Sequence, residues 1–405
     1  MNCHSSDLER FIDLGDQPNG NAFSEPDKLQ DEQKFSCVML VCKQCWQVQI
    51  EEFPSVDSMF ADHPYISGLN KPVVTHFEQL AQDIVQKFKV PQNSLVLDIG
   101  ANDATLLTKF HALGMRVLGI DPCEQVNRLS QKAGITVFQT FWNKQSAQAM
   151  QQLSIYPDLI TATAVFYHVE DLHSFIEGLK LVMKRNTVFC VQCVYLKDII
   201  DKGQFDHFYH EHTMIHAIGP LKRVFTAHGL LLLDVDFYPI HGGSFVLYVG
   251  REDSLFPVSE KVDELIAEEE RVGLNQLQTY LDFTKGVERN KQALLSLLKQ
   301  LKQEGKRIFG LGAPVKGNTL LNYYGIGPEL VECLTEVNPV KIGLCAPGNH
   351  IPVVDENKVD KQPDYYLLLS WNFLDYFVDK YADYLNAGGH FIVPHPSVQI
   401  IGNGK

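Results

Sequence analysis

The sequence has no uninterrupted apolar run of the roughly 18 residues that a membrane-spanning helix needs. Its first residues also lack the basic and apolar regions of a signal peptide, so a cytoplasmic location is expected. Lys and Arg number 35 against 49 Asp and Glu, and no long basic run occurs. Because phosphate-backbone binding depends on clustered cations, we expect neither a nucleic acid nor a membrane as a partner. An anionic substrate must be met by local positive charges.

Core-forming residues are present in ordinary amounts, with 45% hydrophobic and 21% charged residues over 405 positions. A chain of this length is too long for one core and predicts two or three domains. We expect an N-terminal domain at 1–70, a central domain at 71–254, and a helical linker with a C-terminal α/β domain at 255–405. The chain is expected to be a monomer.

The central segment alternates apolar runs with amphipathic stretches, which is the pattern of a doubly wound sheet covered by helices. The run at 95–97 ends in a small-residue turn that contains Asp98, Gly100 and Asn102. The run at 116–120 ends at Asp121, which is placed to accept the hydrogen bonds of a ribose diol. Further strands are expected at 136–138, 159–164, 187–192, 230–237 and 244–249, the last two as an antiparallel hairpin.

The first turn of this segment is poor in glycine. That favours S-adenosylmethionine over a dinucleotide, whose pyrophosphate needs the close backbone approach of G-x-G-x-x-G. A methyltransferase is therefore predicted, with a nucleotide-dependent oxidoreductase as the alternative. In the plainer interpretation, Asp98 and Asp121 simply cap turns.

The segment Phe205-Asp206-His207-Phe208-Tyr209-His210-Glu211-His212 follows this fold and gathers three imidazoles and a phenol beside carboxylates. Histidine has the side-chain pKa nearest neutrality, so a positioned imidazole can remove a carbon-bound proton. The segment predicts enolate or carbanion formation followed by alkylation. A metal held by the H-x2-H-x-H spacing and a loop of structurally satisfied histidines are the alternatives.

Nine cysteines in a chain without export signals indicate thiols or metal ligands rather than disulfides. Cys42 and Cys45 form a C-x2-C pair, the spacing at which one turn presents two thiolates to zinc. Cys3 offers a third ligand, but its partner in a second pair would fall before Met1, so His4 or Cys37 is considered as the fourth. Such a metal would be structural, and buried free thiols are the alternative.

Helices are expected at 260–272 and 277–300, and a second strand-turn-helix follows them. Its turn is expected to span the glycine-rich segment 310–319, where Lys316 adds a positive charge suited to a diphosphate. A purely structural glycine-rich turn is the alternative. The loops at 336–339, 347–352 and 370–372 have the polar and aromatic character of a nucleoside or sugar site, or of ordinary turns.

Over its whole length the chain resembles the sugar C-methyltransferases that act on nucleotide-activated 4-keto-deoxysugars, enzymes of deoxysugar biosynthesis. The resemblance rests on Phe11-Ile12-Asp13-Leu14-Gly15 with Asn21-Ala22-Phe23, the Cys42–Cys45 pair with Val48-Gln49, the segment 98–103, Tyr209-His210-Glu211-His212, His241-Gly242-Gly243-Ser244, and the segment 310–319. It implies a zinc-binding N-terminal domain, a Rossmann-like class I methyltransferase core, and a C-terminal nucleotide-sugar domain.

The resemblance also implies roles for particular residues. His212 aligns with the catalytic base, Tyr209 and Glu211 with its neighbours, and His210 is a further candidate donor. The implied cofactor is S-adenosylmethionine, bound by Asp98, Gly100, Asn102, Asp121, Thr163 and His168. The implied substrate, a nucleotide-diphosphate sugar methylated at carbon 3, is bound by Tyr65, His241, Lys316, Asn318, Glu336, Asn338 and Trp371. A structural Zn²⁺ is implied at Cys3, Cys42 and Cys45.

The chain departs from the family pattern at Thr163-Ala164, Gln192 and Ala104, where relatives often carry Asn-Asn, Glu and Gly. None of these changes removes the implied base. An O- or N-methyltransferase, or an inactive sugar-nucleotide-binding protein, remains the alternative function.

Overall fold

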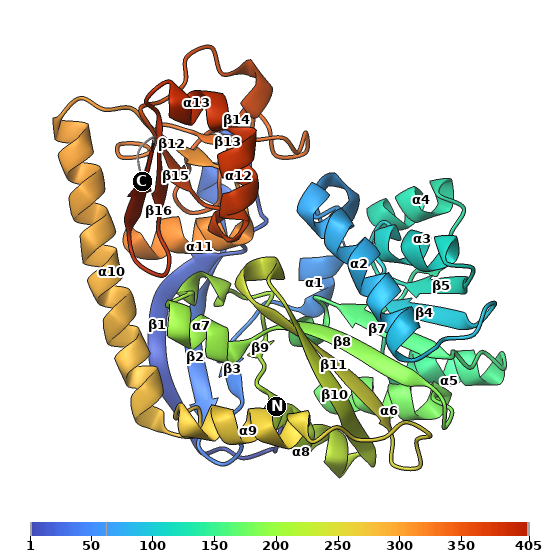
Figure 1. Cartoon of the computed structure of the whole chain (residues 1–405). Coiled ribbons are helices and arrows are strands. Elements are labelled where there is room, and N and C mark those ends of the chain that lie inside the picture. Colours follow the sequence, from blue (N-terminus) through green and yellow to red (C-terminus); the bar gives the residue numbers. More distant parts are fainter. Residues whose placement is uncertain (1, 62, 403–405) are drawn as a thin grey trace.

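The computed structural model describes residues 2–61 and 63–402, which form three sheets (Figure 1). The N-terminal sheet is antiparallel, in the order β1 (Leu8–Pro18), β2 (Lys34–Cys42), β3 (Val48–Ile50) and β9 (Met214–Ile215). Strand β9 follows His212 almost directly in the sequence. The N-terminal sheet therefore includes a piece of chain that the sequence boundaries assign to the central domain.

The central sheet has the strand order of a doubly wound fold with an antiparallel edge. Parallel pairing joins the first five of its strands and antiparallel pairing adds the last two. Every strand expected in this segment is present within about two residues of its expected ends, including the hairpin. The spatial order is β6 (Val137–Phe138), β5 (Arg116–Ile120), β4 (Leu95–Ile99), β7 (Leu159–Thr163), β8 (Val188–Val194), β11 (Ser244–Arg251) and β10 (Leu230–Tyr238).

Alternating residues of these strands enter two different hydrophobic clusters, because successive side chains of a strand point to opposite faces. Val96 packs with α2 (Lys71–Lys87) and α3 (Thr105–Ala112), whereas Leu97 packs with α5 (Lys144–Gln152), α6 (Leu172–Val182) and α8 (Ile218–Ala227). Both faces of the sheet are therefore covered. Shorter helices are α1 (Val56–Phe60), α4 (Glu124–Lys132) and α7 (Leu196–Lys202).

The two expected linker helices are present as α9 (Lys261–Arg271) and α10 (Leu277–Gln303). Figure 1 shows α10 running along one side of the molecule, from α9 to the C-terminal sheet. It packs on β1, where the Thr284 hydroxyl donates to the Phe11 carbonyl at 2.6 Å and the rings of Phe11 and Tyr280 lie 5.2 Å apart. The long helix thus ties the N-terminal sheet to the C-terminal domain.

The C-terminal sheet is parallel except for its last strand. Its order is β14 (Val353–Asp355), β13 (Leu334–Glu336), β12 (Ile308–Leu311), β15 (Tyr365–Leu368), β16 (His390–Val393) and β17 (Gln399–Ile401). Helices α12 (Leu374–Lys380) and α13 (Ala382–Asn386) precede β16. Helix α11 (Val315–Tyr324) begins directly after Pro314, so the turn is shorter than predicted and Lys316 lies in the first turn of the helix. Among the described residues, none of the helices combines the length and apolar character needed to cross a bilayer.

Candidate functional site

Two buried carboxylates mark the carboxyl edge of the central sheet. Asp98, in β4, accepts a hydrogen bond from the Thr161 hydroxyl at 2.6 Å, and burial raises the pKa of Asp98 to about 7. Asp121 follows β5 and accepts hydrogen bonds from the backbone N–H groups of Asn102 and Cys123, both at 2.9 Å. Asp121 therefore caps turns, as the plainer interpretation expected. Each of its oxygens has a second lone pair with which a ligand hydroxyl could bond.

The turn after β4 brings its backbone close to the next loop of the sheet edge. Gly100 has a φ of +72°, and a Cβ atom there would lie 2.3 Å from Cγ2 of Val165. Asn102 donates from Nδ2 to the Tyr65 carbonyl at 3.0 Å, which joins this turn to the segment before α2. Ala104 has a φ of +62°, a conformation that favours glycine, which gives a physical reason for the glycine common in relatives.

A cavity of about 400 Å³ opens over this edge, a volume typical of small-molecule sites. Its wall includes the buried carboxyl groups of Asp98 and Asp121 and the backbone of Gly100, which has no side chain. This combination fits a nucleoside cofactor. Gln192, one of the departures from the family pattern, also lines the cavity, as does His63, which the sequence did not single out. All six residues predicted to bind the cofactor line this cavity together with two predicted substrate residues: Asp98, Gly100, Asn102, Asp121, Thr163, His168, Tyr65 and His241.

His212 is 3% exposed and has a defined tautomer. Its Nδ1 donates to the His207 carbonyl at 2.7 Å, which leaves the lone pair of Nε2 available. Burial, reinforced by the charge of Lys316, holds the pKa of His212 well below its ordinary value. Its ring lies 4.0 Å from that of Tyr209 and 5.2 Å from that of His168. Because His168 lines the cavity, His212 lies one side chain behind the cavity wall.

Glu211 joins three parts of the chain. Its carboxylate accepts hydrogen bonds from Asn21 at 2.7 Å and from Nε2 of His63 at 3.2 Å, and its carbonyl accepts one from Nδ1 of His168 at 2.5 Å. Although burial opposes ionisation, the charge and hydrogen bond of His63 lower the pKa of Glu211. Burial also lowers the pKa of His168 to about 4. A carboxylate and a neutral imidazole therefore flank His212.

The side chains of Tyr209 and His210, the two remaining predicted catalytic residues, point in different directions. Tyr209 lies against His212, and burial holds the pKa of its hydroxyl well above the ordinary value, so it stays protonated as a donor. The structure does not bring His210 to this group. Its Nε2 bonds to the Ser36 carbonyl at 3.2 Å and its ring packs on Phe35, both in the N-terminal domain.

Lys316 lies at the junction of the central and C-terminal domains. Its Nζ is 4.5 Å from the centre of the Trp371 ring and donates to Oδ1 of Asn372 at 2.9 Å. No carboxylate of the described part of the chain lies within 4.0 Å of this ammonium group. Burial lowers the pKa of Lys316 to about 8. A partly buried cation that no carboxylate contacts is costly, which makes this a candidate anion site.

Sequence reasoning missed a buried polar cluster beside Lys316. Asp206, which is fully buried, accepts a hydrogen bond from Nε1 of Trp371 at 2.6 Å, and its other oxygen lies 3.5 Å from Nε2 of His395. Both ring nitrogens of His207 and of His395 are buried without a hydrogen-bond partner among the described residues. Buried polar atoms normally find partners, so these imidazoles point to a further ligand or ordered water.

Three predicted substrate residues hold chain segments together. Asn318 donates to the Gly20 carbonyl at 2.9 Å, and Asn338 donates to the Pro64 carbonyl at 3.5 Å. Glu336 accepts hydrogen bonds from the backbone N–H groups of Ala313, Val337 and Asn338. These contacts give each residue a structural role, while Lys316 and Trp371 retain the features of a binding site.

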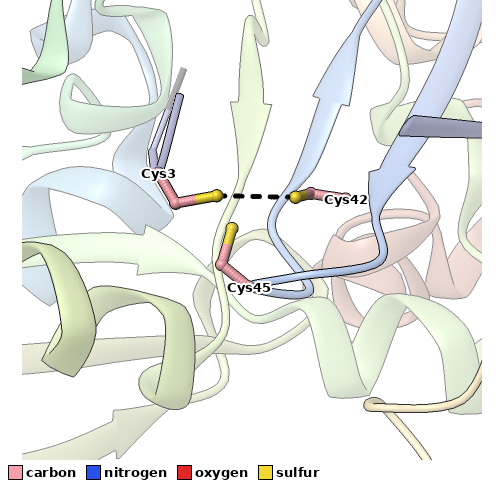
Figure 2. Close-up of side chains that lie close together, drawn as sticks. All are labelled: Cys3, Cys42 and Cys45. Carbon is pink, nitrogen blue, oxygen red and sulfur yellow. Dashed lines mark hydrogen bonds between the residues drawn. The ribbon is translucent and has the colours of Figure 1, made fainter. Parts of the chain in front are cut away.

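The predicted metal ligands Cys3, Cys42 and Cys45 lie together at one end of the N-terminal sheet (Figure 2). Their three sulfur atoms lie within 4.8 Å of one another, and Cys3 and Cys42 are 3.6 Å apart. This arrangement fits a thiolate zinc site. None of the three cysteines lines the cavity over the central sheet, so a metal here would be structural.

Neither of the other two candidate metal ligands joins this group. The His4 ring stacks on His173 with ring centres 4.4 Å apart, and the Cys37 thiol donates to the Phe208 carbonyl at 3.5 Å. Three ligands are therefore together among the described residues, one fewer than a closed structural zinc site uses.

Three family models match the chain in order. They are described as "Putative zinc binding domain" over residues 2–60, "Methyltransferase domain" over 74–235 and "C-methyltransferase C-terminal domain" over 239–396. Among curated proteins, C-methyltransferase NovU of Streptomyces niveus is 28% identical over 401 residues, covering 98% of this chain and 96% of NovU.

Solved structures resemble the chain more distantly. Magnesium protoporphyrin IX methyltransferase of Synechocystis PCC 6803 matches with a TM-score of 0.35 and 14% identity, over 44% of this chain and 83% of that one. The PH0226 protein of Pyrococcus horikoshii OT3 matches with a TM-score of 0.37 and 12% identity, over 49% of this chain and all of that one. On the three family models and the full-length relative, the chain belongs to the S-adenosylmethionine-dependent C-methyltransferases that combine a zinc-binding N-terminal domain, a methyltransferase domain and a C-methyltransferase C-terminal domain.

Proposed function

We propose that this enzyme methylates the carbon next to the ketone of a nucleotide-diphosphate 4-keto-deoxysugar, at carbon 3, through an enolate formed by His212. S-adenosylmethionine supplies an electrophilic methyl group when bound. The observation that carries the proposal is the hydrogen bond from Nδ1 of His212 to the His207 carbonyl. It presents Nε2 of a buried imidazole as the proton acceptor.

His212 takes up the substrate proton at Nε2 while Nδ1 stays bonded to the carbonyl. Because its pKa lies well below the ordinary histidine value, the ring is neutral at neutral pH and ready to act as a base. A ketone makes the neighbouring proton acidic enough for such a base. Carbon, which is otherwise a poor nucleophile, becomes nucleophilic as the enolate.

The negative charge of the enolate needs a donor beside the base. The Tyr209 hydroxyl supports this part of the proposal, because its raised pKa keeps it protonated and its ring contacts that of His212. A donor aimed at developing charge commonly supplies more of the rate enhancement than any other single effect. Glu211, which is ionised and held by Asn21 and His63, has no proton to offer and acts on the position of the neighbouring rings.

An anionic substrate is supported by the groups around Lys316. The ammonium group has no carboxylate partner within 4.0 Å among the described residues, and His207, His395 and the Asn372 amide nitrogen are buried without partners. Together they form a donor-rich site of the kind that binds phosphate oxygens. It lies close enough to His212 for the charge of Lys316 to lower the pKa of His212.

Hydrogen exchange tests this proposal directly. The enzyme is incubated in deuterium oxide with S-adenosylhomocysteine and a 4-keto-6-deoxysugar nucleotide, and deuterium at each sugar carbon is followed by NMR. Wash-in at carbon 3, faster than without protein, is expected. A parallel reaction with S-adenosylmethionine and mass spectrometry identifies the methylated carbon.

Other outcomes identify the alternatives. Methylation of an oxygen or nitrogen without deuterium wash-in would indicate an O- or N-methyltransferase. Absence of S-adenosylmethionine binding by calorimetry would indicate an inactive sugar-nucleotide-binding protein. Either result would replace the enolate mechanism.

A further inference from the structure

Gln192 lies on β8, three strands away from β5 and the predicted ribose contact Asp121 along the carboxyl edge of the central sheet. The strands at the carboxyl edge follow in the order β5, β4, β7 and β8, and they carry Asp121, Asp98, Thr163 and Gln192. Gln192 pairs directly with Thr163 in the parallel register of β7 and β8. Crossing the cavity from Asp121 therefore leads past Asp98 to Gln192. A methyl acceptor would occupy the Gln192 end if the cofactor occupies the other.

Gln192 presents an unpaired donor to this space. Its side chain is 1% exposed, and its Oε1 accepts a hydrogen bond from Nε2 of His76, on α2, at 2.6 Å. Because the oxygen faces His76, the amide nitrogen of Gln192 points away from His76. The nitrogen has no hydrogen-bond partner among the described residues, and the side chain lines the cavity. An N–H group that faces a cavity without a protein partner is free to donate, so a ligand atom that accepts its proton would bind favourably here.

The surroundings of Gln192 disfavour a cation. His241 lines the same end of the cavity, and burial, reinforced by the positive charge of Lys316, lowers its pKa to about 3. Burial also lowers the pKa of His76, which leaves both imidazoles neutral. The carboxylate acting on His76 is Asp83, which already accepts hydrogen bonds from Tyr238 and Gln79. The full charge that acts on His241 is the cation Lys316.

We propose that Gln192, oriented by His76, is a specificity-determining residue that selects an acceptor carrying a hydroxyl or other neutral oxygen at this end over one carrying a protonated amino group. The inference rests on the proposed function, because it takes the acceptor to be a 4-keto sugar nucleotide. The amide N–H donates to an oxygen lone pair. An ammonium group has no lone pair to accept that proton and meets the field of Lys316.

A matched pair of substrates tests this selection. Two nucleoside-diphosphate 4-keto-6-deoxyhexoses are compared that differ only in a hydroxyl or an amino group at carbon 3, and kcat/KM is measured for each by mass spectrometry. The wild type is expected to prefer the hydroxyl compound. Gln192→Glu keeps the shape and the bond to His76 but offers a carboxylate. It should shift the ratio of the two kcat/KM values toward the amino compound by at least about tenfold.

Two further variants separate this change in substrate preference from a general loss of activity. Gln145→Glu places the same charge on an exposed helix position and should leave the ratio unchanged. Gln192→Leu removes the donor without adding charge, and it should raise KM for the hydroxyl compound without improving use of the amino compound. Calorimetry with S-adenosylmethionine checks that each variant is folded and binds the cofactor.

Several results would overturn the inference. One is a wild type that prefers the amino compound, and another is a folded Gln192→Glu enzyme whose ratio of kcat/KM values is unchanged. If the Gln192→Glu variant does not fold, the contradicting result is a Gln192→Leu enzyme that uses the hydroxyl compound as well as the wild type does. Methylation of neither compound by the wild type would instead count against the proposed function on which the inference depends.

Discussion

The indole Nε1 of Trp371 lies 2.6 Å from Oδ2 of Asp206, so the C-terminal domain donates a hydrogen bond into the histidine-rich loop of the central domain. The partners are 165 residues apart and both are buried. This contact sets the distance between the candidate anion site and the base, because Trp371 also lies under Lys316 and His212 follows Asp206 in the same loop.

Replacing Trp371 by Phe should weaken that connection. The change leaves an oxygen of a buried carboxylate unpaired, which is expected to lower the free energy of unfolding by about 1–3 kcal/mol. We also expect a higher KM for the acceptor and an unchanged affinity for S-adenosylmethionine, measured by urea denaturation, kinetics and calorimetry. Trp46→Phe, in the N-terminal domain, is the control. Equal stability of the Trp371→Phe enzyme and the wild type would refute this account.

Replacing His212 by Asn should remove the base and preserve most of the side-chain shape. We expect kcat to fall by about 10²–10⁴-fold, the range that general-base catalysis contributes, while calorimetry shows both ligands still bound. Deuterium wash-in should be lost in parallel. His111→Asn, on the exposed side of α3, serves as the control. Retained turnover in the His212 variant would shift the role of base to His207 or His241.

Lys316→Gln should weaken binding of the anionic acceptor by at least about tenfold, because the ammonium group is the positive charge of the donor cluster. The affinity for S-adenosylmethionine should change much less. Lys285→Gln, which removes a lysine from the exposed face of α10, controls for the change in net charge. Calorimetry with the acceptor alone gives the comparison, and equal affinities in the two variants would remove Lys316 from the binding site.

Buried neutral histidines predict a loss of stability in acid. Burial lowers the pKa of His216 to about 4 from 6.5, so between these values the unfolded chain binds more protons than the folded one. The contribution of His216 to the free energy of unfolding is therefore fully present above pH 6.5. It is lost as pH falls toward 4, at about 1.4 kcal/mol per pH unit. His216→Gln should reduce the slope of the unfolding free energy against pH by that amount. An unchanged slope in urea titrations would contradict the assignment.

The cysteine cluster predicts one zinc ion per chain. Cys42→Ser should lose the metal, measured by elemental analysis, and should lower the melting temperature, because a structural zinc adds folding free energy. Cys37→Ser is the matched control, since Cys37 lies outside the cluster and should retain the metal. Metal content that is equal in the two variants would show that the cluster holds thiols only.

Much of the fold could be predicted because apolar periodicity is local. The run at 95–97 and the acid at Asp121 were sufficient to place β4, β5 and the sheet edge between them. Helix α11 begins earlier than predicted, since Pro314 starts a helix as readily as it ends a turn. Strand β9 has only two residues, too few to leave a pattern in the sequence.

The sequence predicted the site residues that belong to motifs. It did not predict those that only tertiary contacts bring together. His63, Asn21 and Glu211 meet across 148 to 190 residues, and no spacing in the sequence indicates that contact. Asp206 and His395 likewise come from different domains. His210 shares a motif with His212, yet its ring faces Ser36, because direction depends on the backbone after each residue rather than on residue type.

The two-residue strand β9 makes truncation experiments hazardous. Its pairing with β3 means that a fragment ending near residue 70 would lack its fourth strand, and a fragment starting there would leave the stretch just behind His212 without the partner that anchors it. Separate expression of the three segments would therefore sever the scaffold of the base itself. Solution studies should keep all three domains in one polypeptide.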